Sequence, residues 1–298
     1  MFVNAIKEVA QFTKPIHTVT RTLKGITSPG AATFFFINEN GDAITCKHVA
    51  ELIIHSQKIN DYFEQYKTQL KQIQSDHNQK NNERLLDKKF NFKHDTIVQI
   101  KNAFINSVNP VQSIDFKVHP TLDLAILQFK GFSSKLYQSH AVFVKDSSQV
   151  QQGRYLCRLG FPFPEFNNFA YNHTSNDVEW TTTGNTFTPI FPIDGIITRF
   201  IGTSTSTGGN IIGGIEMSTP GLRGQSGGPL FDSNGLVYGM QSATGHLHLG
   251  FDLTNHEVMD QGKKTLVSNH PFLHVGHCIH VDRIKEFLTQ HNVKFYES

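Results

Sequence analysis

A serine among close glycines carries the strongest chemical signal in this sequence. Ser226 lies in residues 219–230, which read Thr-Pro-Gly-Leu-Arg-Gly-Gln-Ser-Gly-Gly-Pro-Leu. A serine hydroxyl becomes a useful nucleophile when a base takes its proton and N–H donors hold the oxyanion that forms. Glycines permit a tight turn that aims several N–H groups at one point. Ser226 is therefore a candidate nucleophile, and the N–H groups of Gly224 and Ser226 are candidate oxyanion donors.

A nucleophilic serine needs a base, and in a triad the base is oriented by an acid. His48 follows a strand predicted at residues 42–46 and precedes a helical turn, which suits a base. Asp123 begins an apolar run, where a carboxylate is costly unless it has polar partners. The chain has 16 histidines, so His48 taken alone would be read as a loop histidine. Together with Asp123 and Ser226 it predicts a triad.

The elements that must position these residues are mainly β. Alternating runs rich in Val, Ile, Thr and Phe predict strands in both halves of the chain. The main predicted strands are residues 16–26, 32–37, 42–46, 96–105, 111–118, 152–160, 195–201, 211–217, 229–231, 236–242 and 272–281. Residues 133–152 connect the two halves. Residues 281–291 place apolar side chains on one helical face and predict a closing helix.

A polar segment at residues 51–89 interrupts the strand pattern. Its apolar residues recur at helical spacing and predict an amphipathic helix, with a loop near residues 75–82. Such a helix either packs on its own domain or serves as an arm for a partner or for self-association, and the sequence leaves both open.

Residues 161–180 are rich in aromatic side chains, and Pro162 and Pro164 favour an irregular loop there. Two roles fit this loop equally well, since connecting segments only sometimes carry function. It either lines a substrate groove or covers the end of a barrel.

Composition excludes several classes of function. The 298 residues contain 27 Lys and Arg against 25 Asp and Glu, so no electrostatic case exists for nucleic acid or an anionic membrane. No apolar run is long enough to span a bilayer, and residues 1–14 lack the continuous apolar core of a secretory signal. Three widely spaced cysteines argue against a disulfide framework. We expect a cytoplasmic location, with export by a leaderless route left open.

Histidines gather near the C-terminus, where imidazole and thiol groups are the ligands that zinc prefers. The cluster comprises His270, His274, His277, Cys278 and His280, with His246 and His248 nearby. In a strand, His274, Cys278 and His280 would share one face. Their spacing matches no closed zinc motif, so we predict neither a metal site nor a cofactor.

The sequence Gly-Gln-Ser-Gly-Gly at residues 224–228 also fits the nucleophile elbow of α/β hydrolases. That fold requires a helix directly after the serine, and an acid and then a histidine downstream. Here Pro229 and a strand–turn–strand pattern follow the serine, and alternating βαβ units are missing. We reject the elbow on these grounds.

Taken together, these residues resemble the trypsin-like (chymotrypsin-fold) serine proteases, in particular the bacterial HtrA/Deg-type protease domain. The matching stretches are residues 44–49, 122–127, 153–162, 221–230, 236–242 and 276–288. The resemblance implies one protease domain, residues 1–298, built on two antiparallel six-stranded β-barrels, and no PDZ domain. The expected parts are a first barrel at 16–135 with the helical insertion 51–89, a second barrel at 150–281, and a closing helix and tail at 282–298.

The resemblance also implies roles for residues. Ser226 would be the nucleophile, His48 the general base and then acid, and Asp123 the residue that orients His48, with the oxyanion held by the N–H groups of Gly224 and Ser226. Ser242 would support the aspartate. The edge on which substrate pairs as an added strand would be Ser242, Ala243 and Thr244.

The residue whose carbonyl is attacked, here called the acyl-side residue, would bind in a pocket with its floor near Pro220 and Gly221. Its walls would lie near residues 241–244 and 275–277. No acidic residue is expected at the floor, and Gln241 stands where a glutamate-specific relative would have histidine. We therefore expect a small, polar or apolar acyl-side residue.

Two departures from the family bear on regulation. Gln225 replaces the aspartate that pairs with a freed N-terminus in digestive relatives, so activation by cleavage is not expected. Cys46 lacks the disulfide partner usual beside the histidine. We expect a serine endopeptidase that cleaves protein or peptide substrates through an acyl-enzyme. The alternative is a protease-fold binding or regulatory protein whose activity is absent or gated by a partner.

Overall fold

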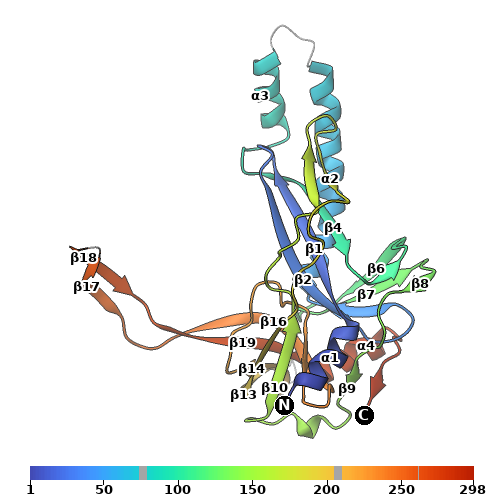
Figure 1. Ribbon diagram of the computed structural model, residues 1–298, viewed down its shortest axis with the longest axis vertical. Helices are drawn as coiled ribbons and strands as arrows, with labels where there is room; N and C mark the ends of the chain where they lie inside the picture. Colours follow the sequence, from blue (N-terminus) through green and yellow to red (C-terminus); the bar gives the residue numbers. More distant parts are fainter. Residues whose placement is uncertain (74–78, 205–209, 261) are drawn as a thin grey trace.

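The structure is a computed structural model that describes residues 1–73, 79–204, 210–260 and 262–298. Its helices are α1 (Val3–Phe12), α2 (Lys47–Ile73), α3 (Gln79–Lys89) and α4 (Val281–Gln290). The strands of the first half are β1 (Thr13–Thr22), β2 (Thr27–Phe36), β3 (Asp42–Thr45), β4 (Ile97–Phe104), β5 (Val108–Asn109), β6 (Ser113–Val118), β7 (Ala125–Lys130), β8 (Ser134–Lys135) and β9 (Val142–Phe143). The strands of the second half are β10 (Tyr155–Gly160), β11 (Phe169–Asn172), β12 (Asp177–Trp180), β13 (Phe191–Ser204), β14 (Asn210–Met217), β15 (Pro229–Phe231), β16 (Val237–His248), β17 (Leu253–Asp260), β18 (Lys263–Asn269), β19 (Phe272–His280) and β20 (Tyr296–Glu297). The fold is mainly β, as the sequence predicts (Figure 1).

The first half forms a curled antiparallel sheet of six strands in the order β4-β1-β2-β3-β7-β6. Phe34, Phe35 and Phe36 are consecutive on β2, and all three are fully buried. Successive side chains of a strand point to opposite faces, so this strand is covered on both sides. Phe34 and Phe36 pack on Phe129 of β7, whereas Phe35 faces Phe12 of α1. Buried phenylalanines thus join the sheet to the helix beside it.

The second half is a closed ring of six strands in the order β15-β10-β13-β14-β19-β16, because β15 also pairs with β16. Short parallel pairings add β9 and β20 beside β16. The two six-stranded antiparallel units predicted from the sequence are therefore present. The second closes completely, whereas the edge strands β4 and β6 of the first do not pair with each other in the described chain. The closing helix α4 buries Ile284, Phe287 and Leu288.

The helical insertion begins at Lys47 rather than residue 51, so its first turn contains His48. It forms two helices, α2 and α3, and the predicted loop at 75–82 falls partly outside the described residues. Both helices share an aromatic cluster with the start of β4. The buried members of the cluster are Phe63, Tyr66, Leu86, Phe90 and Val98. Packing on the chain's own sheet is therefore observed, and an additional role in docking stays a prediction.

The irregular loop predicted at residues 161–180 is wrong in its second half, where β11 and β12 form a hairpin. Phe166 is buried against Val19 of β1 and stacks on His17 at a ring-centroid distance of 4.0 Å. This contact covers the middle of β1 in the first sheet. The two prolines remain irregular, as expected, and line a cleft described below.

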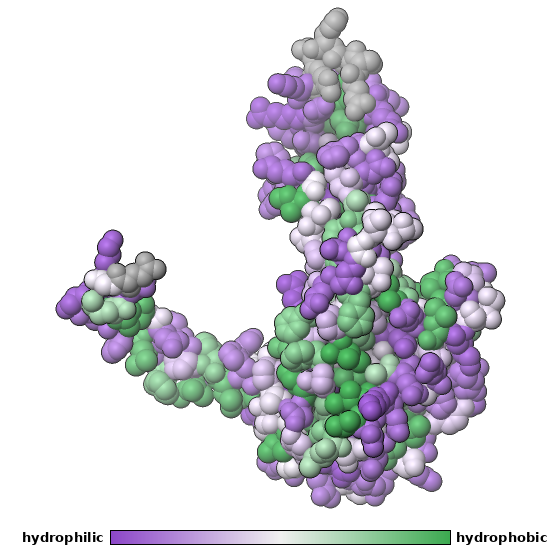
Figure 2. All heavy atoms as spheres, in the orientation of Figure 1, coloured by the Kyte–Doolittle hydropathy of each residue, from purple (hydrophilic) through white to green (hydrophobic). Residues whose placement is uncertain are grey.

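Strands β16 and β19 run beyond the closed ring and continue into the hairpin β17–β18, which projects from the body as an arm (Figure 1). The sequence analysis did not predict this arm. Exposed apolar side chains of the arm include Leu253, Met259 and Leu266. Figure 2 shows hydrophobic surface along the arm. Across the described residues, no helix combines the length and apolar character needed to cross a bilayer.

Candidate active site

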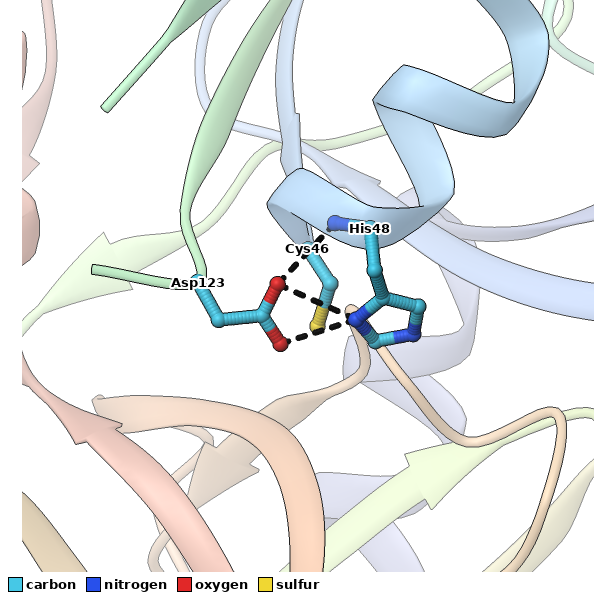
Figure 3. A group of neighbouring side chains, drawn as sticks. All are labelled: Cys46, His48 and Asp123. Atoms are coloured by element: carbon cyan, nitrogen blue, oxygen red, sulfur yellow. Dashed lines mark hydrogen bonds and ion pairs between the residues drawn. The ribbon is translucent and has the colours of Figure 1, made fainter. Parts of the chain in front are cut away.

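Figure 3 shows His48 beside Asp123, which lies in the turn between β6 and β7. The His48 ring Nδ1 lies 3.0 Å from Oδ1 and 2.9 Å from Oδ2 of the carboxylate. The backbone N–H of His48 donates to Oδ1 over 3.0 Å. A carboxylate facing Nδ1 stabilises the tautomer that carries its proton there. The helix start and the strand turn thus leave Nε2 of His48 free to accept a proton.

Ser242 completes the surroundings of Asp123, since its hydroxyl donates to Oδ2 over 2.8 Å. Burial alone would raise the pKa of Asp123, but the hydrogen bonds from His48 and Ser242 outweigh it and hold that pKa below its usual value. Asp123 is therefore ionised at neutral pH.

The Ser226 loop consists of two successive turns, with Gly224 and Gly227 at positive φ of 102° and 87°. In these turns the Gln225 N–H donates to the Leu222 carbonyl, and the Gly228 N–H donates to the Gln225 carbonyl. Positive φ is strained for residues with a Cβ, which explains the glycines at these positions. Close packing adds a second reason, because a Cβ on Gly227 would lie 2.1 Å from the Thr33 carbonyl oxygen.

Thr33 of β2 holds this loop against the first sheet, a role that the sequence analysis missed. Its N–H donates to the Ser226 carbonyl over 3.0 Å, and its hydroxyl donates to the Gly224 carbonyl over 2.7 Å. The Phe161 N–H donates in turn to the Thr33 hydroxyl. A buried threonine within an apolar strand was the available signal, because buried hydroxyls need partners.

Gln225 braces the loop from within and is fully buried. Its Oε1 accepts from the Leu222 N–H over 3.0 Å, and its amide donates to the Phe191 carbonyl over 3.1 Å. These neutral hydrogen bonds hold the loop without an ion pair to a chain terminus. Activation without cleavage stays a prediction.

Ser226 faces a cleft together with the candidate oxyanion donors. Within the described chain, the N–H groups of Gly224 and Ser226 donate to no other residue, so both are free for a ligand. The Ser226 hydroxyl donates to the Ser242 carbonyl over 3.4 Å, and it forms no hydrogen bond with the ring of His48. Catalytic hydrogen bonds are often long or misaligned until substrate binds.

The cleft has a volume of about 680 Å³ and runs between β1, β2 and the start of α2. Its lining includes His48, Gly224 and Ser226 together with apolar residues such as Ile16 and Leu52. Pro162 and Pro164 form part of the rim, which gives the irregular segment a place beside the cleft. A polypeptide segment can therefore approach the Ser226 hydroxyl through an apolar groove.

The edge predicted to bind substrate, residues 242–244, has no neighbouring strand on one of its two sides within the described chain. Strand β15 pairs with β16 only as far as Met240. Beyond it, Ala243 and Thr244 pair with β19 on one side, and Ser242 lies at the register shift between Gln241 and Ala243. One wall of the predicted pocket meets its floor, since the Thr244 hydroxyl donates to the Gly221 carbonyl over 2.6 Å, and strand pairing of β16 with β19 joins it to the other wall. Between them lies Arg158 of β10, whose guanidinium contacts Pro220 and Gln241. Sequence reasoning missed Arg158, although a charged residue inside a buried apolar strand was a signal.

The histidines near the C-terminus do not converge on one point. His280 caps α4, while His246 and His274 face each other at 2.6 Å between their Nδ1 atoms. Ligand atoms of His248, Asp252 and His270 lie within 4.8 Å of one another on the exposed arm, so this group has the donor types of a metal site.

Cys46 also lies beside His48 and Asp123 (Figure 3). Burial raises the pKa of its thiol well above the usual value, and the Asp123 charge adds to this effect. Its Sγ donates to the Gln241 carbonyl over 3.2 Å. Cys46 is therefore a protonated, hydrogen-bonded thiol rather than a nucleophile.

Comparison with known proteins agrees with this geometry. Residues 32–240 match the family model of the trypsin-like peptidase domain. No curated protein sequence matches the chain. Among solved structures, it is similar to the Rv3671c protease of M. tuberculosis in its active form, with 12% identity, a TM-score of 0.48, and coverage of 99% of this chain and 87% of that one.

It is also similar to the HtrA-type protease AlgW solved with a tripeptide, with 12% identity, a TM-score of 0.44 and coverage of 98% of this chain. The chain spans 65% of the length of that AlgW chain. The family match covers more than half of the chain and includes the segments that carry His48, Asp123 and Ser226. This chain therefore belongs to the trypsin-like peptidase domain family.

Proposed function

We propose that this protein is a serine endopeptidase in which Ser226 attacks the scissile carbonyl, His48 transfers the proton and Asp123 orients His48. The observation that supports this most strongly is the set of donors around the Asp123 carboxylate. They come from the backbone and ring of His48 and from Ser242, and they hold Nδ1 of the ring against the acid. Nε2 is left as the only ring nitrogen that can accept the Ser226 proton.

The proposed reaction proceeds in two halves. The Ser226 hydroxyl rotates from the Ser242 carbonyl toward His48, transfers its proton to Nε2 and adds to the substrate carbonyl. The oxyanion accepts hydrogen bonds from the free N–H groups of Gly224 and Ser226. His48 then protonates the leaving amine, and the acyl-enzyme forms. Water activated by the same ring releases the acid product and restores Ser226.

The proposed substrates are proteins or peptides in extended conformation. The unpaired side of residues 242–244 offers backbone groups to which a substrate strand can hydrogen-bond. The cleft at the start of α2 receives the chain on the other side of the scissile bond.

The test is covalent labelling of the purified protein by a fluorophosphonate probe, with the Ser226→Ala variant alongside. We expect labelling of the native protein at Ser226 and none of the folded variant. Persistent labelling of Ser226→Ala would refute the assignment. Failure to label the folded native protein would instead favour a protease-fold protein whose activity is absent or gated.

A further inference from the structure

A buried arginine occupies the place expected for the acyl-side residue. Arg158 is 0% exposed, and its guanidinium lies between the two walls of the predicted pocket. A Cβ on Gly276 would lie 2.1 Å from Nη1 of Arg158, and a Cβ on Gly221 would lie 2.2 Å from the Gln241 amide. Two glycines therefore leave room for these two side chains between the walls.

The partners of Arg158 are all neutral. Nη2 donates to the Thr219 carbonyl over 2.9 Å, to its hydroxyl over 2.5 Å, and to the Pro220 carbonyl over 3.2 Å. Nη1 donates to Oε1 of Gln241 over 2.6 Å, and Nε is buried without a partner. No carboxylate lies within 4.0 Å of Arg158 in the described parts of the chain. The nearby Asp194 instead accepts a hydrogen bond from Tyr155.

A buried cation without a counterion is costly, because desolvation is not repaid by an opposite charge. Burial lowers the pKa of Arg158, but a guanidinium remains charged in proteins. The neutral Gln241 oxygen stands where one oxygen of a carboxylate would give a stronger, charge-assisted bond. The site is therefore built to accept an anion that the chain itself does not supply.

We propose that Arg158 is the specificity-determining residue of the pocket and selects glutamate or aspartate as the acyl-side residue; this inference rests on the proposed function. The substrate carboxylate displaces Oε1 of Gln241 from Nη1, and the wall at Thr244 separates from the floor at Gly221, where a hydrogen bond now joins them. The sequence disfavoured an acidic acyl-side residue because position 241 is not histidine. The structure supplies the missing cation from β10, on a segment remote in sequence.

The test uses matched fluorogenic peptides that differ only in glutamate or glutamine at the acyl-side position. We expect kcat/KM of the native enzyme to favour glutamate by about 100-fold or more, the scale of a desolvated charge pair. Arg158→Met removes the charge, and Gln241→Glu neutralises it internally with little change of shape. Both variants should lose the preference while fluorophosphonate labelling of Ser226 persists.

Arg154→Met is the matched control, since Arg154 precedes the same strand but pairs with Asp232, and it should keep the preference. If Arg158→Met does not fold, Gln241→Glu decides the question. If Ser226 is labelled but cleavage after glutamate and glutamine is equally fast, the proposed specificity is overturned and the proposed function stands. A preference that survives in Gln241→Glu would overturn it as well. Absence of labelling in the native protein would refute both proposals.

Discussion

The Asp123→Asn substitution tests the proposed mechanism at the carboxylate whose hydrogen bonds the structure defines in full. Oδ1 accepts from the His48 backbone N–H, and Oδ2 accepts from the Ser242 hydroxyl, while both oxygens lie within 3.0 Å of Nδ1. Asparagine keeps one acceptor and places an NH₂ donor at the other position. One hydrogen bond must therefore be lost or reversed, whichever way the amide is oriented.

The expected loss depends on which amide atom bonds to Nδ1, because both carboxylate positions lie within 3.0 Å of it. If the amide N–H donates to Nδ1, the ring carries its proton on Nε2 and cannot accept the Ser226 proton. If the amide oxygen accepts from Nδ1, the tautomer is kept, but the negative charge beside the ring is gone. In a triad of this kind, the first case lowers the reaction rate by about 10⁴-fold, equivalent to about 5 kcal/mol of activation free energy. We expect Asp123→Asn to slow labelling of Ser226 by about 10³- to 10⁴-fold.

The assay is the second-order rate constant for fluorophosphonate labelling, with folding followed by circular dichroism. Ser242→Ala is the control, because it removes one hydrogen bond and leaves both the charge and the ring contact in place. It should slow labelling by about 10-fold. A folded Asp123→Asn protein that labels within about 10-fold of the native rate would refute an orienting role for Asp123.

Three further outcomes follow from the same contacts. Gly227→Ala should destabilise the fold by about 3 kcal/mol or more in denaturant titration, because positive φ and a backbone clash combine, and an unchanged midpoint would contradict this. The pKa of Glu216 is lowered: burial raises it, but hydrogen bonds from Arg199 and Thr198 outweigh that effect. Ionised Glu216 therefore contributes to folding stability above its unfolded-state pKa, and this contribution is lost as the pH falls through its folded-state pKa. Glu216→Gln should lower the free energy of unfolding by about 1 kcal/mol at neutral pH, and an equal decrease in acid would contradict this. A thiol reagent at pH 8 should react only after denaturation with Cys46, Cys157 and Cys278, because burial raises their pKa values.

The sequence by itself determined the β-rich fold class, the candidate nucleophile and its two proposed partners. These are local signals: glycines around Ser226 specify a turn, and an acid at an apolar strand start requires polar partners. Local patterns also predicted most of the strands, and the family resemblance implied two six-stranded units. The local patterns failed for the arm β17–β18, whose strands are almost entirely exposed, and for the hairpin β11–β12, whose strands have only four residues each, so neither shows a periodicity that could be detected.

Only the tertiary structure decided what surrounds these residues. Thr33 reaches the Ser226 loop across 191 positions, and Arg158 reaches Gln241 across 83. Neither pairing follows from spacing, since the first depends on how the two sheets pack against each other and the second on how the second sheet closes into a ring. The charge of the proposed pocket is likewise set by burial of Arg158, which a sequence does not display. Residue types thus indicated the chemistry, and long-range packing determined which partners and charges surround the reacting groups.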